Sequence, residues 1–410
     1  MTARLITAGC LLALAVAAAA GAAAQTGGTA AISDGVVKIG LILDMSGPYS
    51  DATGVGSATA ASMAVEDFGG KVLGAPVEVV VADHRDNVDR AAAIARQWFG
   101  SDHVDAIMDV AGSSEALLVQ AVATTRDRIV MLSAPGAERL TNEACSPVAV
   151  HYAFDTYAVA HTVAPAVLQR GGNSWFFVTV DYSFGYDLEN EFTAVIKAGG
   201  GQVLGATRHP FGAADFSSYL AQARQSGATV IALANAGNDM VAALTRAGAI
   251  GMIPGPQIFV PLALRFTSVN RIGLPITQNM PVAEPFYWDY DDRTRTWSRR
   301  FLSRVGTMPN SLQAGVYSAV THYLKAVATA GTDATAPVMQ AMRAAPVDDF
   351  FAHNGRIRAD GVMVHDMHLF QVKEPGQSRD RWDDYRLVET VPGDKAFRPV
   401  EQSQCRLVRP

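Results

Sequence analysis

Short apolar runs alternate with amphipathic segments along most of the chain. Runs such as residues 129–132 and 229–234 are almost wholly apolar, which is typical of strands covered on both faces of a parallel sheet. Helical patterns of roughly 10–15 residues separate the runs, and this alternation predicts an α/β fold. The predicted strands are 36–43, 77–81, 106–110, 129–132, 175–180, 203–206 and 229–234.

The strand–helix pattern occurs in two successive blocks, which predicts two sheets and therefore two lobes. Residues 151–160 lie between the blocks and are the natural first crossover, and the proline-rich segment 258–285 could carry a second crossing. The predicted helices are 54–68, 89–99, 114–125, a helix from after Tyr157 to Gln169, 184–198, 216–226, 239–247, 293–305, 311–330 and 338–344.

Residues 355–373 alternate in polarity around Asp360 and Gly361, which predicts a hairpin with an Asp-Gly turn. His365 and His368 lie three residues apart in this segment. Side chains at that spacing on a strand point to opposite faces, so we expect two solvent-exposed histidines rather than a metal site.

Motifs of common enzyme and cofactor sites are missing where predicted strands meet helices. No nucleophile elbow G-x-S-x-G occurs there, and Gly54-Val55-Gly56 lacks the third glycine of a dinucleotide-binding turn. The sequence therefore predicts a protein that is not an enzyme and that takes no cofactor or metal.

Residues 1–24 have the pattern of a removable secretory signal peptide. One positive charge, Arg4, precedes an apolar run, and three alanines before Gln25 provide the cleavage site. After residue 25 no window approaches the ~20 apolar residues that a membrane-spanning helix needs. The net charge of −6 comes without a basic stripe, which argues against nucleic-acid binding. An exported chain of about 385 residues, enough for two domains, follows from this pattern.

Two cysteines, Cys145 and Cys405, lie beyond the leader. An even number of cysteines in an oxidising compartment favours a disulfide, which would join the C-terminal tail to the middle of the chain. Two free buried thiols are the alternative.

Small polar residues follow several predicted strands. The loops at 44–50, 111–114 and 133–136 offer hydroxyl groups and backbone N–H groups with little side-chain bulk. Ligands of open α/β sheets lie beyond the carboxyl ends of the strands, and helix N-termini bind anions. A serine in such a place can also be a helix N-cap, so it is the set of loops that predicts a carboxylate site.

Seven segments, in order along the chain, carry a resemblance to a known family. They are KIGLILDMSGPYSDATG, GSSEALLVQAVA, IVMLSAPGAERLT, HYAFDTYAVA, DYSFGYDLE, GATRHPFGAADFSSYLAQARQSGATVIALANAGND and the predicted hairpin. In these the chain resembles the periplasmic substrate-binding proteins of the leucine/isoleucine/valine-binding type, which are receptors of ABC importers. The resemblance implies a type I periplasmic binding protein fold, with two Rossmann-like lobes that contain parallel central sheets and are joined by a three-strand hinge. Lobe 1 would comprise residues 36–154 and 283–355, lobe 2 residues 157–281 and 356–395, and residues 396–410 would form a C-terminal tail.

The resemblance also implies a ligand site between the lobes. The loops at Ser113 and Ser133 would hold the ligand carboxylate, Tyr157 in the crossover would make an aromatic contact, and lobe 2 would add further loops. Such a receptor would be a periplasmic monomer that works with permease and ATPase subunits at the inner membrane. A ligand-sensing clamp that controls a regulator or receptor is the alternative function. The implied ligand-binding residues are Ser46, Tyr49, Ser113, Ser114, Ser133, Ala134, Tyr157, Asp181, Phe184, Asn235 and Leu262.

One departure from the family pattern bears on the ligand. Family members that bind amino acids carry an acidic residue after the strand that corresponds to 258–260, where it pairs with the ligand ammonium. This chain has the sequence PLALR at 261–265, without a carboxylate. Because an unpaired buried ammonium is costly, we expect a carboxylate ligand without an amino group, such as an aromatic or other organic acid. Asp44 or Asp181 could still supply the missing negative charge.

Overall fold

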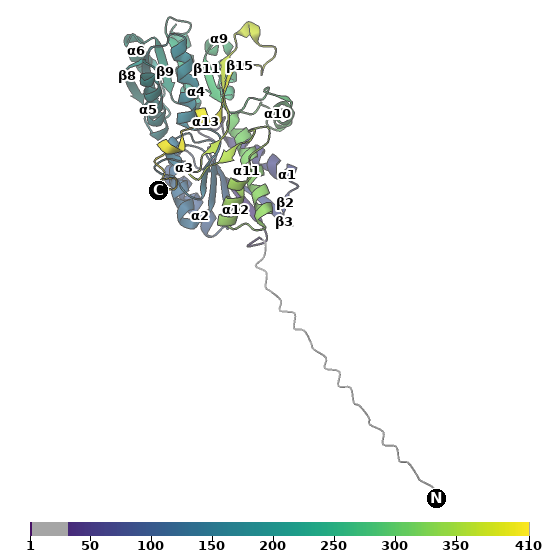
Figure 1. Ribbon diagram of the computed structural model, residues 1–410. Helices are drawn as coiled ribbons and strands as arrows, with labels where there is room; N and C mark the ends of the chain where they lie inside the picture. Colours follow the sequence, from purple (N-terminus) through teal and green to yellow (C-terminus); the bar gives the residue numbers. More distant parts are fainter. Residues whose placement is uncertain (2–31, 410) are drawn as a thin grey trace.

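The computed structural model describes residues 1 and 32–409, which form two α/β lobes (Figure 1). Apart from residue 1, the predicted signal peptide lies outside these residues. The first lobe, lower in the figure, contains a six-stranded sheet in the order β2-β3-β1-β4-β5-β6, parallel except where β2 pairs with β3. Its strands are β1 (Val37–Leu43), β2 (Lys71–Val72), β3 (Ala75–Asp83), β4 (Ala106–Val110), β5 (Ile129–Leu132) and β6 (Ala149–His151).

The second lobe, upper in the figure, is built on a four-stranded parallel sheet in the order β10-β9-β7-β8. A three-stranded antiparallel sheet, β11-β14-β15, lies beside it, and β12 pairs with β13 in a small separate ladder. The strands of this lobe are β7 (Ser174–Val180), β8 (Gln202–His209), β9 (Val230–Ala234), β10 (Ile258–Pro261), β11 (Pro281–Glu284), β14 (Met367–Val372) and β15 (Tyr385–Val391). The β12 (Arg356–Ile357) and β13 (Met363–Val364) ladder adjoins the first lobe, where Val362 bridges His151 of β6.

Several helices begin and end at local sequence signals. For example, α10 and α11 start with capping boxes at Asp291 and Asn310 and end at Gly306 and Gly331, which adopt the left-handed conformation that glycine favours. The predicted α/β class with two sheets is confirmed. The helices are α1 (Gly54–Asp67), α2 (Val88–Gly100), α3 (Ser113–Arg126), α4 (Thr156–Gln169), α5 (Ser183–Ala198), α6 (Ser217–Gln225), α7 (Gly237–Ala249), α8 (Phe266–Ile272), α9 (Leu274–Thr277), α10 (Asp292–Val305), α11 (Ser311–Ala330), α12 (Thr335–Ala344) and α13 (Gly393–Ala396).

The chain passes between the lobes more than once. It leaves the first sheet after β6 and enters α4, which packs on α5 of the second lobe. After β11 it returns, because α10 and α11 pack against α1. It then runs back to the second lobe in β14, which pairs with β11. These passages place the carboxyl ends of both parallel sheets around the space between the lobes.

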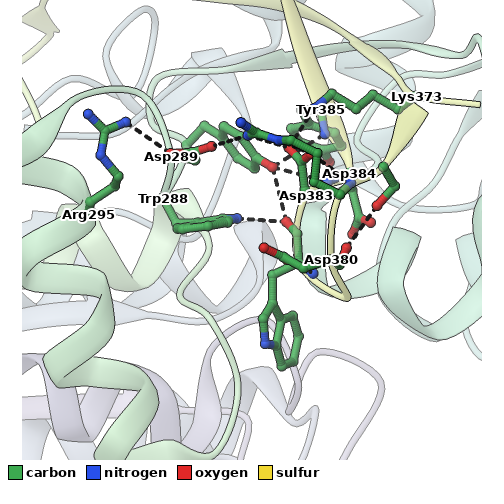
Figure 2. Close-up of polar contacts among 12 residues, drawn as sticks. Trp288, Asp289, Arg295, Lys373, Asp380, Asp383, Asp384 and Tyr385 are labelled. Carbon is green, nitrogen blue, oxygen red and sulfur yellow. Dashed lines mark hydrogen bonds and ion pairs between the residues drawn. The ribbon is translucent and has the colours of Figure 1, made fainter. Parts of the chain in front are cut away.

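A polar network attaches the second of these passages to the loop before β15 (Figure 2). The indole N–H of Trp288 donates to the carbonyl of Trp382 at 2.7 Å. Asp289 accepts hydrogen bonds from Arg295 and Arg379 at 2.9 and 3.0 Å. The position of this passage is therefore fixed by contacts with residues about ninety positions further along the chain.

The predicted hairpin at 355–373 forms only in its first half. The backbone N–H of Arg358 donates to the carbonyl of Val362 around the predicted turn, but β14 pairs with β11 and β15 instead of folding back. The expectation of exposed histidines is wrong, because His365 and His368 are both buried. His365 precedes β14 and packs against the rings of Phe351 and Phe397, and His368 on β14 stacks on Tyr290 with ring centroids 4.5 Å apart.

The predicted disulfide between Cys145 and Cys405 is present, with Cα atoms 5.5 Å apart. It joins the C-terminal tail to the segment between β5 and β6 of the first lobe, across 260 residues of sequence. Within the described part of the chain, no helix combines the length and the apolar character that crossing a bilayer requires.

Candidate functional site

A cleft with about 530 Å³ of empty space, part of it open to solvent, lies between the lobes. The loops after β1, β4 and β5 form its wall in the first lobe, and the loops after β7, β9 and β10 form its wall in the second. Residues on its surface include Tyr49, Thr53, Gly112, Ser113, Ala134, Gly136, Phe154, Tyr182, Phe184, Gly237, Arg265, Ser268 and Leu312.

Four helices begin at this cleft, α1, α3, α5 and α7. Their N-cap residues Thr53, Gly112, Tyr182 and Ala236 all line the cleft, and none of the four caps its helix with a side-chain hydrogen bond. By contrast, α2, α4 and α10 are each capped by an Asn or Asp side chain. The first-turn N–H groups of a helix have no intrahelical partner and carry partial positive charge, so the cleft surface favours an anion.

Among the described residues that line the cleft, Arg265 is the only one with a formally charged side chain. Its side chain is 7% exposed, and Nη1 donates to Glu284 Oε2 at 2.8 Å. The guanidinium carbon lies 4.1 Å from the centroid of the Phe154 ring. Within residues 32–409, Nε and Nη2 have no hydrogen-bond partner in the protein, so these N–H groups are available to a ligand. Sequence reasoning missed this residue because it considered only the acid that segment 261–265 lacks.

Glu284 balances the charge of Arg265 from behind the cleft. It lies at the end of β11, its side chain is 1% exposed, and it also accepts a hydrogen bond from the hydroxyl of Ser311. Burial raises the pKa of the Glu284 carboxyl, while Arg265 and Ser311 oppose that rise. The guanidinium of Arg265 therefore pairs with Glu284 through Nη1, while the residue also lines the cleft.

Ser113 is the hydroxyl donor of the first lobe. Its Oγ accepts the backbone N–H groups of Gly136 and Ala137 at 3.3 and 3.2 Å. A serine hydroxyl has one proton and two lone pairs, so the proton remains for a further acceptor. The residue lies at the first turn of α3 and lines the cleft. Ser113 and Arg265 thus approach the cleft from opposite lobes.

Backbone donors in two of the predicted loops are already occupied by carboxylates of the chain. Asp109 Oδ1 accepts the N–H groups of Ser133 and Ala134 at 3.0 and 2.9 Å, and burial raises the pKa of Asp109 to about 6 despite these bonds. The Asp44 carboxylate accepts the N–H groups of Ser46 and Tyr49 at 3.2 and 2.7 Å. These N–H groups therefore do not face a ligand.

The other carboxylate proposed as an ammonium partner, Asp181, is exposed and accepts a hydrogen bond from the Tyr186 hydroxyl. Neither it nor Asp44 lines the cleft. Both alternatives for the missing negative charge are thus placed away from the space that the ligand would enter.

The structure brings some of the predicted site residues together and not others. Those on the cleft surface are Tyr49, Ser113, Ala134 and Phe184, and Ser114 lines an adjoining compartment. Those outside the cleft lining are Ser46, Ser133, Tyr157, Asp181, Asn235 and Leu262.

Tyr157 illustrates why a position in the crossover does not by itself reach the ligand. Its ring stacks on His161 with centroids 3.7 Å apart, and the Arg398 guanidinium lies 4.4 Å from its centroid. Arg398 in turn binds Glu138 of the first lobe and Glu191 of α5. The tail that carries Arg398 thereby covers Tyr157, and Phe154 is the crossover aromatic that lines the cleft.

A second compartment, which we call the annex, adjoins the cleft and contains about 450 Å³ of empty space. Tyr49, Gly112 and Tyr182 line both spaces. The hydroxyl oxygens of Tyr49 and Tyr182, from different lobes, are 2.5 Å apart, and both rings pack against Phe211. The far wall of the annex contains His84, Asp86, Ser114 and Glu115.

The lobes are in contact at the mouth of the cleft. Besides the Tyr49–Tyr182 hydrogen bond, the N–H of Asn238 donates to the carbonyl of Pro48 at 3.1 Å, and Arg271 pairs with Asp51. Over the described residues, no group of three or more His, Cys, Asp or Glu side chains is arranged to hold a metal ion. The two lobes therefore touch each other beside the cleft that they enclose.

A family model described as "Periplasmic binding protein" matches residues 36–378 of the chain. The chain belongs to this family, whose members are substrate-binding receptors of ABC transporters and not enzymes. The resemblance stated from the sequence motifs and the fold that it implied are therefore confirmed.

Solved structures share the whole fold. A periplasmic binding protein from Burkholderia mallei is 44% identical with a TM-score of 0.89, and the match covers 91% of this chain and 99% of that one. A branched chain amino acid ABC transporter periplasmic ligand-binding protein from Burkholderia xenovorans LB400 is 35% identical with a TM-score of 0.82, covering 91% and 100%. An ABC transporter solute binding protein from R. palustris, solved in complex with benzoate, shares the fold at 18% identity and a TM-score of 0.81, covering 91% and 100%.

Among curated proteins, the Leu/Ile/Val-binding protein homolog 6 of Brucella abortus (strain 2308) is 28% identical over 202 residues, which are 49% of this chain and 50% of the relative. The chain thus spans about half the length of the curated relatives it matches. The match agrees with the family assignment.

Proposed function

We propose that this chain is an exported receptor of an ABC importer, that it captures a small carboxylate lacking an α-amino group, and that it delivers this ligand to a membrane permease. The leader at residues 1–24 would direct it to the periplasm, where it would act as a monomer. The observation that carries the proposal is Arg265, a buried cation with free N–H groups in a cleft whose described lining contains no carboxylate.

The charge distribution of the cleft supports an anion over a zwitterion. A carboxylate would accept charge-assisted hydrogen bonds from Arg265 and a hydrogen bond from the Ser113 hydroxyl, and the uncapped ends of α3, α5 and α7 add favourable dipoles. An α-ammonium beside that carboxylate would meet the same donors and no carboxylate of the cleft lining. Desolvating an unpaired ammonium is costly, so an amino acid is expected to bind more weakly than its deaminated counterpart.

The body of the ligand would lie among apolar side chains. Phe154, Phe184 and Leu312 line the cleft, and Gly136 lies directly under the two phenyl rings. Such walls favour an aromatic or branched hydrocarbon body through apolar burial. The R. palustris relative with bound benzoate has the same fold, which is compatible with an aromatic acid as the ligand.

A carboxylate that bridges Ser113 and Arg265 would also explain closure. Ser113 follows a strand of the first lobe and Arg265 follows a strand of the second, so only the closed form offers both sets of donors. A ligand shifts an equilibrium towards the form that it binds better, here the closed clamp. The hinges would be residues 154–157 and 282–285, where the chain passes between the lobes.

The test is a calorimetric and thermal-shift panel on residues 25–410. It pairs leucine with 4-methylpentanoate, phenylalanine with 3-phenylpropanoate, and adds benzoate. A ligand that binds only the folded state raises the melting temperature, and we expect shifts with acids but not with amino acids. Micromolar binding of leucine without binding of any acid would refute the proposal.

A variant pair locates the site. Ser113→Ala removes the free hydroxyl proton and should weaken acid binding roughly tenfold, the usual effect of losing one hydrogen bond to a charged group. Ser133→Ala, in the neighbouring loop but outside the cleft lining, is the matched control and should bind as the wild type does. Equal affinities for both variants would mean that the carboxylate lies elsewhere.

A further inference from the structure

His84 lies on the annex wall and carries a hydrogen-bond donor that no described protein group accepts. The residue is 1% exposed. Its Nδ1 accepts the backbone N–H of Asp86 at 3.1 Å, and burial lowers the pKa of the imidazole, so the neutral ring carries its proton on Nε2. Nε2 is buried and has no hydrogen-bond partner among the described residues. A ligand that brings an acceptor would satisfy it.

Two carboxyl groups on the same wall of the annex need hydrogen-bond donors, whereas His84 needs an acceptor. Asp86 and Glu115 line the annex, and within residues 32–409 neither forms an ion pair with Lys or Arg. The charged groups nearest to both are other carboxyls, with Asp44 beside Asp86. This part of the annex therefore favours a hydrogen-bond donor, although it lies next to a chamber that favours an anion.

We propose that the annex receives a hydroxyl group at the far end of the ligand, so that the ligand is a hydroxylated carboxylic acid. The hydroxyl oxygen accepts the Nε2–H of His84, and its proton donates to the carboxyl of Asp86 or Glu115. This inference rests on the proposed function, because it requires the carboxylate of the same molecule to be held at Arg265. Tyr49 and Tyr182 come from different lobes and line both spaces, so the boundary between cleft and annex is complete only when the lobes meet.

An ammonium group, a carboxylate and a halide each satisfy only half of this site. An ammonium group can donate to the carboxyls but has no lone pair for the Nε2–H of His84. A carboxylate or halide can accept from His84 but has no proton for Asp86 or Glu115. A hydroxyl group does both, and sites built to hydrogen-bond a ligand hydroxyl discriminate strongly against the analogue that lacks it.

The first experiment compares matched acids by calorimetry on wild-type residues 25–410. The pairs are benzoate with 4-hydroxybenzoate, 4-methylbenzoate with 4-(hydroxymethyl)benzoate, and pentanoate with 5-hydroxypentanoate. We expect the hydroxylated member of at least one pair to bind about tenfold or more tightly. The amines 4-(aminomethyl)benzoate and 5-aminopentanoate, of nearly the same shape, should bind more weakly than the matching alcohols.

The second experiment removes the donor. His84→Asn retains an oxygen that can accept the N–H of Asp86 but has no group in place of Nε2–H. The hydroxylated acid should lose about tenfold in affinity, and its unsubstituted partner should bind unchanged. His103→Asn is the control, since His103 is exposed and its positive φ of 55° is one that asparagine tolerates.

The outcomes separate this inference from the proposed function. If acids bind but no hydroxyl improves affinity, if the amines bind more tightly than the alcohols, or if His84→Asn retains the preference, the annex assignment is overturned and the carboxylate receptor stands. If none of the acids binds, both fall. Arg265→Met should weaken both members of a pair equally, which distinguishes loss of the carboxylate site from loss of the hydroxyl site.

Discussion

Arg265 pairs with the buried Glu284 carboxylate and also lines the cleft, so replacing it should change both the stability of the protein and its affinity for the ligand. In Arg265→Met the Glu284 carboxylate keeps only the Ser311 hydroxyl as a side-chain partner in an environment where it is 1% exposed. Breaking a buried ion pair by removal of one partner costs about 3–5 kcal/mol, because the remaining charge is left uncompensated. We therefore expect the free energy of unfolding, measured by urea titration at pH 7, to fall by about that amount.

The double variant Arg265→Met with Glu284→Gln separates the two roles of the arginine. The glutamine keeps an oxygen for Ser311 and removes the unpaired charge, and replacing a whole buried pair by neutral groups is often close to neutral in stability. Most of the lost free energy should return. Affinity for the acid should not return, because the cation that faces the cleft is still missing.

The expected loss of affinity follows from the hydrogen bonds that a ligand carboxylate would accept from Arg265. Hydrogen bonds to charged groups contribute about 1.5–3 kcal/mol, which corresponds to roughly 10- to 150-fold in the dissociation constant. Calorimetry with the tightest acid from the ligand panel measures it in all three proteins. A stable double variant that binds the acid like the wild type would show that Arg265 serves Glu284 alone. A single variant as stable as the wild type would refute the argument from the buried pair.

Three further predictions concern closure, the tail and acid stability. Gly237→Ala, at a φ of +58°, places a Cβ atom 2.6 Å from the carbonyl of Pro48 in the opposite lobe, so ligand should no longer compact this variant in X-ray scattering. The control Gly227→Ala has a φ of +69° and open space around it, and it should close normally. Equal compaction of both variants would contradict this prediction. Cys405→Ser opens a crosslink across 260 residues, and the unfolding free energy should fall by up to about 5 kcal/mol in a urea titration, an effect that a reducing agent should reproduce in the wild type. Burial opposes ionisation of Asp383, but hydrogen bonds from Arg379 and Lys373 lower the pKa of its carboxyl from 3.8 to about 2 (Figure 2). The ionised carboxylate therefore contributes about 1–2 kcal/mol to the free energy of unfolding above pH 4, and this contribution disappears as the pH falls through 2. Asp383→Asn should therefore be less stable than the wild type at pH 7 and equal to it near pH 2, and a gap that persists at pH 2 would exclude this mechanism.

Much of the fold could be predicted because its signals are local. The strands at 106–110 and 129–132 and the helix at 311–330 were predicted with the bounds that the structure has. Apolar runs, caps and glycine stops act over a few neighbouring residues, so they can be recognised without knowledge of partners. The hairpin prediction at 355–373 failed for the converse reason, since the partners of β14 are 13 to 90 residues away along the chain.

The site was predictable as a set of loops, but not residue by residue. Parallel strands bring their carboxyl ends to one edge, and this placed Tyr49, Ser113, Ala134 and Phe184 on the cleft. The backbone N–H of Ser133 could not be recognised as occupied, because its acceptor, Asp109, lies on another strand.

The sequence by itself determined the alternation of strands and helices, the two sheets, the family and the candidate cysteine pair, since each depends on composition or on short-range periodicity. Only the tertiary structure decided which polar groups remain free to meet a ligand. Arg265 faces the cleft because Glu284, on a strand nineteen residues later, holds one side of its guanidinium. His84 is left with an unpaired donor because its Nδ1 accepts the backbone N–H of Asp86 and no described residue lies where it could accept the Nε2–H. Whether a hydrogen-bonding group is satisfied depends on neighbours in space, and the pattern along the chain does not contain that information.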